Sequence, residues 1–155
     1  MSASIDRVRE AYGRTVDRPL YDEVRGLWKR HSIAEDRRDL DGLIATLTPD
    51  CRYELVQFAR VWQGHAGARA FYTELLGAFP DVDFALENIV IGPQGVFEEA
   101  RMTATWSGAW LGRAPTGGTI ATRVLIVFPW DPEARRFRGE RVFVDTPEAI
   151  GGGVT

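Results

Sequence analysis

Residues 83 to 145 form an almost continuous succession of strand patterns, and this stretch does most to limit the folds open to the chain. Runs rich in Val, Ile, Phe and Thr are separated by the turn GPQG, the loop AWLGRAPTGG and the turn PWDPEARR. Strands joined by short connections of this kind pair with their sequence neighbours in antiparallel order. The second half of the chain therefore predicts a meander of about four antiparallel strands.

The first half shows helical periodicity instead. Apolar side chains recur at the spacing of an amphipathic helix from Leu20 to about Asp36. We expect two further helices over residues 39–47 and 65–79, with a strand, CRYELVQF, between them. A shorter amphipathic helix is predicted within about the first 15 residues.

This order of elements favours the α+β class. We expect a cone-shaped α+β barrel, in which a curved antiparallel sheet carries about three to four helices on one face and encloses a pocket. A chain of 155 residues has the usual size of one domain. Within it we expect a helical extension over residues 1–19, the cone over 20–150 and a flexible tail over 151–155.

Charge and composition argue against several kinds of partner. The net charge of −3 is small and the basic residues are dispersed, so we expect no nucleic acid. No apolar run approaches the ~18 residues of a membrane span, and the N-terminus is charged where a signal peptide is apolar. We therefore expect a cytoplasmic protein that does not enter membranes. One cysteine and two histidines give neither a disulfide nor a Cys/His metal site, whereas a carboxylate-rich metal site stays open.

Four features carry a resemblance to a known family. They are AEDRRDLDGLIATLTPDCRYEL, FYTELLGAFPDVDF, GAWLGRAPTGGTI and an Asp at the end of the last strand. In order and spacing they resemble the SnoaL-like polyketide cyclase branch of the nuclear transport factor two-like superfamily, over roughly Leu20 to Ile150. The resemblance implies a cone-shaped, often dimeric α+β barrel. It implies no single reaction, because members range from cyclases, isomerases, dehydratases and epoxide hydrolases to non-catalytic binding modules.

Asp145 is the residue that the resemblance places in the role of general acid/base. By strand alternation it shares a face with Arg141 and Phe143, opposite Val142 and Val144. If that face points into an apolar cavity, burial raises the pKa of Asp145 and fits it for proton transfer near neutral pH. The alternative is that Asp145 only begins the Thr-Pro turn that follows it.

Two other polar residues are catalytic candidates. Arg101 could pair with Asp145 or polarise a substrate oxygen, although a close Arg would lower the pKa of Asp145; an exposed strand face is the alternative. His31 lies on the apolar side of the first long helix and could act as a second proton carrier. Its alternative is a core histidine whose hydrogen bonds are satisfied within the protein.

Aromatic side chains are the candidates for binding an apolar ligand. Two tryptophans flank the Gly-rich loop, and one tyrosine could donate its hydroxyl to a substrate oxygen, while core packing is the alternative role for such residues. With the aromatic neighbours of His31 and Asp145 added, the predicted substrate-binding residues are Trp28, Tyr53, Trp106, Trp110 and Phe143.

These features lead to two hypotheses for function. The first is a cofactor-independent enzyme, a cyclase, isomerase or dehydratase, that moves protons on a hydrophobic carbonyl-containing small molecule such as a polyketide. The second is a non-catalytic module that binds a small molecule or supports assembly. Epoxide hydrolysis is disfavoured, because Thr103 stands where the related hydrolases carry a second Asp after the Arg. The apolar segment TRVLIVF further predicts a homodimer.

Overall fold

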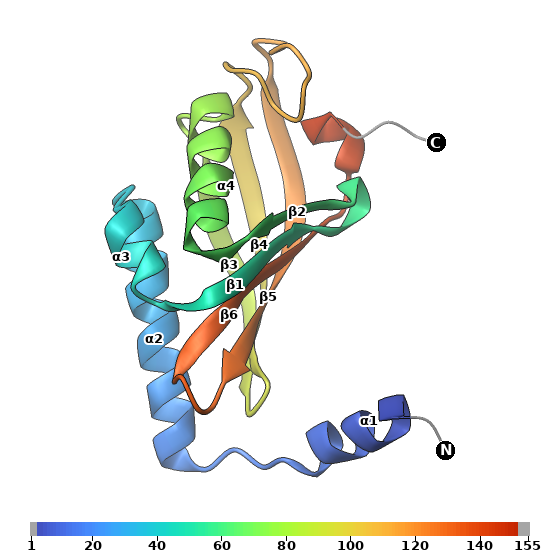
Figure 1. Ribbon diagram of the computed structural model, residues 1–155. Helices are drawn as coiled ribbons and strands as arrows, with labels where there is room; N and C mark the ends of the chain where they lie inside the picture. The colour runs from blue at the N-terminus through green and yellow to red at the C-terminus, as the bar shows by residue number, and fades with distance from the viewer. Residues whose placement is uncertain (1–2, 152–155) are drawn as a thin grey trace.

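The computed structural model describes residues 3–151 and contains one curved, six-stranded sheet (Figure 1). The strands lie in the order β2-β1-β6-β5-β4-β3. Their bounds are β1 (Leu47–Leu55), β2 (Arg60–Gln63), β3 (Asp83–Gly92), β4 (Gly95–Thr105), β5 (Thr119–Asp131) and β6 (Arg136–Val144). The meander from β3 to β6 is antiparallel as predicted, whereas β1 pairs in parallel with β6 and so joins the two halves of the chain.

Residues 3–151 form four α-helices, and all but the first lie on one side of the curved sheet (Figure 1). They are α1 (Ala3–Gly13), α2 (Arg18–Asp36), α3 (Leu40–Ile44) and α4 (Gly64–Ala78), with short 3₁₀ turns η1 (Val56–Phe58) and η2 (Pro147–Ile150). Local sequence sets the helix starts: the Asp17 side chain accepts from the Leu20 N–H and that of Asp39 from the Gly42 N–H, both at 2.9 Å. The predicted α+β fold is confirmed.

α1 is separate from this layered body. It lies away from the sheet in Figure 1, and Val8 and Tyr12 on it are exposed. The Gln94 side chain, in the turn between β3 and β4, donates to the Ala11 carbonyl at 2.6 Å. The tail predicted from residue 151 lies outside the described residues except for Gly151. None of the helices described in residues 3–151 is long and apolar enough to cross a membrane.

The inner face of the sheet forms the core with the helices. Along β5 the even-numbered residues from Ile120 to Trp130 are buried, while their neighbours face outward. Trp130 therefore belongs to a strand, and the turn predicted to include it begins later, after Asp131. The strand expected at CRYELVQF begins earlier, because Thr48-Pro49-Asp50 is part of β1, and it ends at Leu55. Cys51, Tyr53 and Leu55 share the buried face as predicted.

A bulge in β6 changes which side chains face inward. Phe137 and Glu140 are both buried although three positions separate them, so the two-residue alternation is broken between them. Gly139 has φ 107°, and a Cβ there would lie only 2.1 Å from the Arg52 carbonyl oxygen of β1. Glycine allows both this backbone conformation and this close approach. After the bulge, Glu140, Val142 and Val144 face the inside of the cone.

Candidate active site

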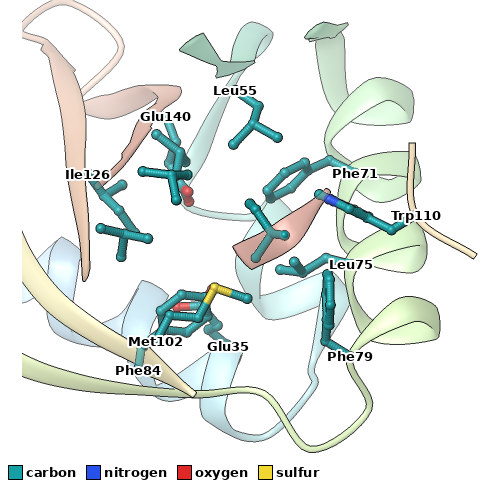
Figure 2. A pocket seen from close by; sticks show the side chains of 14 residues that line it. Glu35, Leu55, Phe71, Leu75, Phe79, Phe84, Met102, Trp110, Ile126 and Glu140 are labelled. Atoms are coloured by element: carbon teal, nitrogen blue, oxygen red, sulfur yellow. The ribbon is translucent and has the colours of Figure 1, made fainter. Parts of the chain in front are cut away.

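An apolar cavity lies between the inner face of the sheet and α4 (Figure 2). The cavity is small, with a volume of about 30 Å³. Two of its lining residues, Glu35 and Glu140, carry carboxyl groups. The others are Leu55, Phe71, Leu75, Phe79, Phe84, Met102, Trp110, Val124, Ile126, Val142, Val144 and Ile150.

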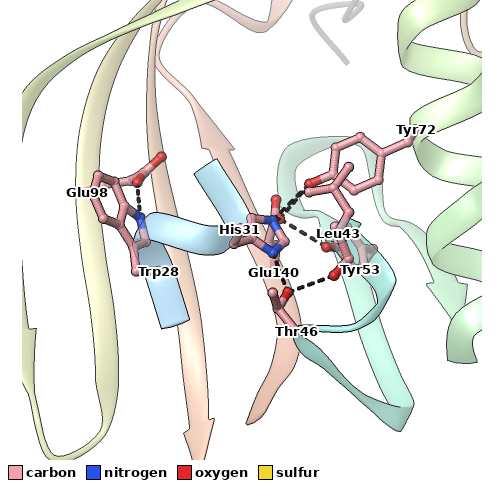
Figure 3. A network of polar contacts seen from close by, with 8 residues as sticks. All are labelled: Trp28, His31, Leu43, Thr46, Tyr53, Tyr72, Glu98 and Glu140. Carbon is pink, nitrogen blue, oxygen red and sulfur yellow. Dashed lines mark hydrogen bonds and ion pairs between the residues drawn. The ribbon is translucent and has the colours of Figure 1, made fainter. Parts of the chain in front are cut away.

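Glu140 is held by three hydrogen bonds to one of its two oxygens (Figure 3). Its Oε1 accepts from the hydroxyls of Tyr53 at 3.0 Å and Tyr72 at 2.8 Å, and lies 2.9 Å from Nε2 of His31. Burial, reinforced by the negative charge of Glu140, raises the pKa of both tyrosines well above the usual value, so they remain donors. Oε2 makes no hydrogen bond within the described part of the chain. Glu140 therefore has one anchored oxygen and one free to act on a ligand.

The proton arrangement on His31 follows from its neighbours. Thr46 Oγ1 donates its single proton to the Leu43 carbonyl at 2.6 Å, so at 2.7 Å it accepts from Nδ1–H of His31. The other ring nitrogen, Nε2, lies 2.9 Å from Glu140 Oε1. His31 and Glu140 are thus a buried, directly contacting pair, in which Glu140 lines the cavity and His31 lies behind it.

Glu35 supplies the second carboxyl group of the cavity. It lies at the C-terminal end of α2, four residues after His31, and its side chain makes no hydrogen bond or ion pair among residues 3–151. Burial, and then the negative charges of Glu140 and Glu98, raise the pKa of Glu35 well above its usual range. The protonated, neutral form of Glu35 is favoured, and a neutral acid can donate a hydrogen bond or a proton.

Glu98 is a third inward carboxyl group, on β4 beside the cavity. Its Oε2 accepts from the Trp28 indole N–H at 2.7 Å (Figure 3). Burial raises the pKa of Glu98 to about 7, with Glu140 adding to the rise and the Trp28 hydrogen bond opposing it. The interior thus contains three carboxyl groups, on α2, β4 and β6, and the negative charge of Glu140 contributes to the raised pKa of the other two. No three His, Cys, Asp or Glu side chains in the part of the chain that the structure describes form a set of metal ligands.

Three of the predicted site residues lie outside the cone. Asp145 is exposed on the outer face, and its backbone N–H donates to the Arg123 carbonyl at 2.8 Å. Phe143 lies on the same face under the Arg141 guanidinium, and Arg101 is exposed, with its Nε 3.3 Å from Glu87. The expectation that this face of the last strand points into the cavity was wrong, because the β6 bulge turns Val142 and Val144 inward instead.

The other predicted residues lie inside. His31 and Tyr53 hold Glu140, Trp28 holds Glu98, and Trp110 lines the cavity. Trp106 is buried next to the cavity, where it packs on Phe79 with ring centroids 5.9 Å apart, but it is not among the lining residues. These side chains come together because the inner faces of α2, β1 and β4 and the loop after β4 converge there.

Sequence reasoning missed Glu35, Glu140 and Tyr72. A signal existed for each carboxylate: Glu35 follows His31 at helical i+4 spacing, and Glu140 follows a glycine inside a strand, which indicates a bulge. Tyr72 lies among the buried, mostly apolar residues of α4. Its hydroxyl role depends on the distant Glu140 and has no local signal.

Solved structures share this fold at low sequence identity. A predicted SnoaL-like polyketide cyclase from Jannaschia sp. CCS1 superposes with a TM-score of 0.77 and 21% identity, over 88% of this chain and 95% of that one. AclR, a predicted hydroxylase from Streptomyces galilaeus, superposes with a TM-score of 0.65 and 21% identity, over 81% of this chain and 91% of that one. TerC, co-crystallised with polyporic acid, has a TM-score of 0.66 and 13% identity, over 81% of this chain and 94% of that one. A search of functionally curated proteins gave no match.

The sequence itself identifies the family. The model of the SnoaL-like domain matches residues 28–146, which span the chain from α2 to the end of the sheet. The structural neighbours, which include an NTF2-like protein, agree with this match in fold. The chain therefore belongs to the SnoaL-like family, as the sequence features predicted, and shares the fold of NTF2-like proteins.

Proposed function

We propose that the protein is a cofactor-independent acid/base enzyme that moves protons on a hydrophobic, carbonyl-containing small molecule such as a polyketide. One observation carries this proposal: a single apolar cavity contains a hydrogen-bonded carboxylate with a free oxygen, Glu140, and a second carboxyl group that favours its neutral form, Glu35. Two carboxyl groups in different environments, one hydrogen-bonded and one buried without a partner in residues 3–151, are a general arrangement for base and acid roles.

The proton steps follow from this geometry. Oε2 of Glu140 takes a proton from the carbon next to the substrate carbonyl, and the C–H electrons form the C=C bond of an enol. The carbonyl oxygen receives the proton of Glu35 as its π electrons move onto it. In each onward reaction the enol O–H proton returns to Glu35, which restores the carbonyl where the enol is consumed, and the proton on Glu140 goes to a new atom. Its transfer to another carbon gives isomerisation, its transfer to a leaving β-hydroxyl gives water and dehydration, and its transfer to the oxygen of a second carbonyl that the enol carbon attacks gives cyclisation.

His31, Tyr53 and Tyr72 are positioning residues in this scheme. They hold Oε1 of Glu140 through hydrogen bonds of 2.8 to 3.0 Å and fix the direction of Oε2. The apolar walls exclude water, which strengthens the electrostatic effect of each carboxyl group on a bound carbonyl. The family match and the description of similar folds as polyketide cyclases support a small-molecule substrate of this class.

Deuterium exchange at carbon tests the proposal without the natural substrate. 1-Tetralone in D₂O exchanges the protons next to its carbonyl, and NMR follows the rate. We expect the protein to accelerate exchange and Glu140→Gln to remove about 10²–10⁴-fold of that acceleration. Glu99→Gln, on the outer face of β4, is the matched control and keeps the wild-type rate. Unchanged exchange in Glu140→Gln would refute the catalytic role of Glu140.

A non-catalytic binding module is the second candidate. It is favoured by the small volume of the cavity, about 30 Å³, because side chains must move before a ring system can enter. Such a module would bind 1-tetralone without accelerating exchange, so the same experiment separates the two functions.

We also propose a homodimer formed through the outer face of the sheet. Phe97 and Leu125 are more than two-fifths exposed there, beside Arg123, which pairs with Glu87 and Glu99. A face with apolar residues and charges of both signs can complement its own copy. Light scattering at micromolar concentration should give twice the mass of the chain, and Leu125→Asp should halve it. A monomeric wild type would contradict this proposal.

A further inference from the structure

Trp110 carries a buried hydrogen-bond donor that no group in residues 3–151 satisfies. It lies in the loop between β4 and β5, is 2% exposed, and packs edge-on against Phe79 with ring centroids 5.4 Å apart. Its Nε1 has no hydrogen-bond partner among the described residues. Figure 2 shows the indole nitrogen pointing from the loop toward the interior of the cavity that Trp110 lines.

An unsatisfied N–H of this kind is costly, at about 1–3 kcal/mol. Neighbouring tryptophans avoid the cost: Trp106 Nε1 donates to the Gly108 carbonyl at 2.8 Å, and Trp28 Nε1 to Glu98 at 2.7 Å. Trp130 Nε1 also lacks a partner in the part of the chain that the structure describes, but Trp130 does not line this cavity. Trp110 Nε1 is therefore a donor without a partner in residues 3–151, at a position where a ligand in the cavity could supply the acceptor.

Trp110 and the carboxyl groups approach the cavity from different walls. Glu140 is on the sheet wall, in β6, whereas Trp110 packs on Phe79 just after α4, on the helix wall. In Figure 2 the two side chains lie on opposite sides of the cavity. A ligand that places one oxygen at Glu140 and Glu35 would present its far end to Trp110.

We infer that the Trp110 indole N–H is a specificity determinant that binds a second oxygen of the substrate, remote from the reacting carbonyl. The ligand class is an apolar ring compound with two acceptor oxygens at opposite ends, because an indole N–H donates and cannot accept. The inference rests on the proposed function only in taking the ligand oxygen at Glu140 and Glu35 as that of the reacting carbonyl. Binding of the second oxygen at Trp110 does not require catalysis.

Three probes of one ring system isolate this contact. 6-Methoxy-1-tetralone has acceptor oxygens at both ends, 1-tetralone lacks the far oxygen, and tetralin lacks both. Calorimetry gives the affinity of each for the wild type and for Trp110→Phe, which keeps an aromatic ring and removes the N–H. We expect Trp110→Phe to reduce the preference for 6-methoxy-1-tetralone over 1-tetralone by about 3- to 10-fold. Trp106→Phe, whose indole donates to backbone, is the matched control and keeps the wild-type preference.

The indole resonance gives a readout that is independent of turnover. The Trp110 ¹H–¹⁵N signal, assigned by its loss in Trp110→Phe, should move downfield with 6-methoxy-1-tetralone by more than with 1-tetralone or tetralin. An equal loss of affinity for all three probes in Trp110→Phe, an indole signal that does not distinguish them, or no binding of any probe would overturn the inference. Failure of the proposed function would instead appear as deuterium exchange that Glu140→Gln leaves unchanged, with the Trp110 response intact.

Discussion

Replacing Gly139 with Ala should disrupt the bulge that turns Glu140 into the cavity. At φ 107° an alanine backbone is strained by about 1–3 kcal/mol. The added Cβ would also meet the Arg52 carbonyl oxygen at 2.1 Å, and both residues are paired between β6 and β1. Moving the two strands apart should cost about 1–3 kcal/mol more, the usual range for an overpacked site. We therefore expect a loss of about 2–6 kcal/mol in the free energy of unfolding.

Urea unfolding followed by circular dichroism measures this loss, and the thermal midpoint should fall on the order of 5–20 °C. Gly117→Ala is the matched control, because Gly117 also has positive φ, 71°, yet a Cβ there would meet no atom within 4 Å. Its cost should be limited to the backbone strain. Equal costs for the two variants would refute the argument that close approach of β6 to β1 requires glycine at the bulge.

Three further predictions concern the buried acids, the histidine and the displaced aspartate. The pKa of Glu98 is raised from 4.5 to about 7, so the folded state binds the extra proton between these values. The contribution of Glu98 to stability is therefore complete below about pH 4.5, and about 3 kcal/mol of it is lost as pH rises to about 7. Glu98→Gln should flatten this fall in urea unfolding measured from pH 5 to 8, and a curve parallel to that of the wild type would contradict the assignment. His31→Ala should cost about 3–5 kcal/mol of unfolding free energy, because it leaves a cavity and takes a partner from both Glu140 and Thr46. A cost no larger than that of His65→Ala would count against the network. Asp145→Asn should change the unfolding free energy by no more than about 0.5 kcal/mol and leave tetralone exchange unchanged, since Asp145 is exposed; lost exchange would return the catalytic role to Asp145.

Much of the fold could be predicted because its signals are local. The apolar spacing of α2 and α4 and the caps at Asp17 and Asp39 depend on residues within one or two turns. The buried face of β1 follows from alternation alone. The parallel pairing of β1 with β6 has no such signal. β1 precedes the meander and β6 is its last strand, so the two strands are far apart in the sequence.

The site could be predicted only in part. His31 and Tyr53 were identified from their positions on buried faces, but the carboxylate that they hold was not, because a bulge at Gly139 shifts the alternation of β6. That bulge depends on the approach of β1, almost ninety positions away in the chain by residue number. The same shift explains why Asp145, correctly placed at the end of the last strand, faces outward.

The protonation state of Glu35 is the most direct test of the proposed proton-transfer site. Carbon-13 labelling of the glutamate carboxyl groups, with Glu35→Gln to assign the signal, allows NMR titration of this one acid. The structure predicts a midpoint well above the ordinary value of about 4.3, and a change in the signal when 1-tetralone enters the cavity. A Glu35 signal that titrates near about 4.3 and does not respond to 1-tetralone would contradict an acid/base site in an apolar cavity.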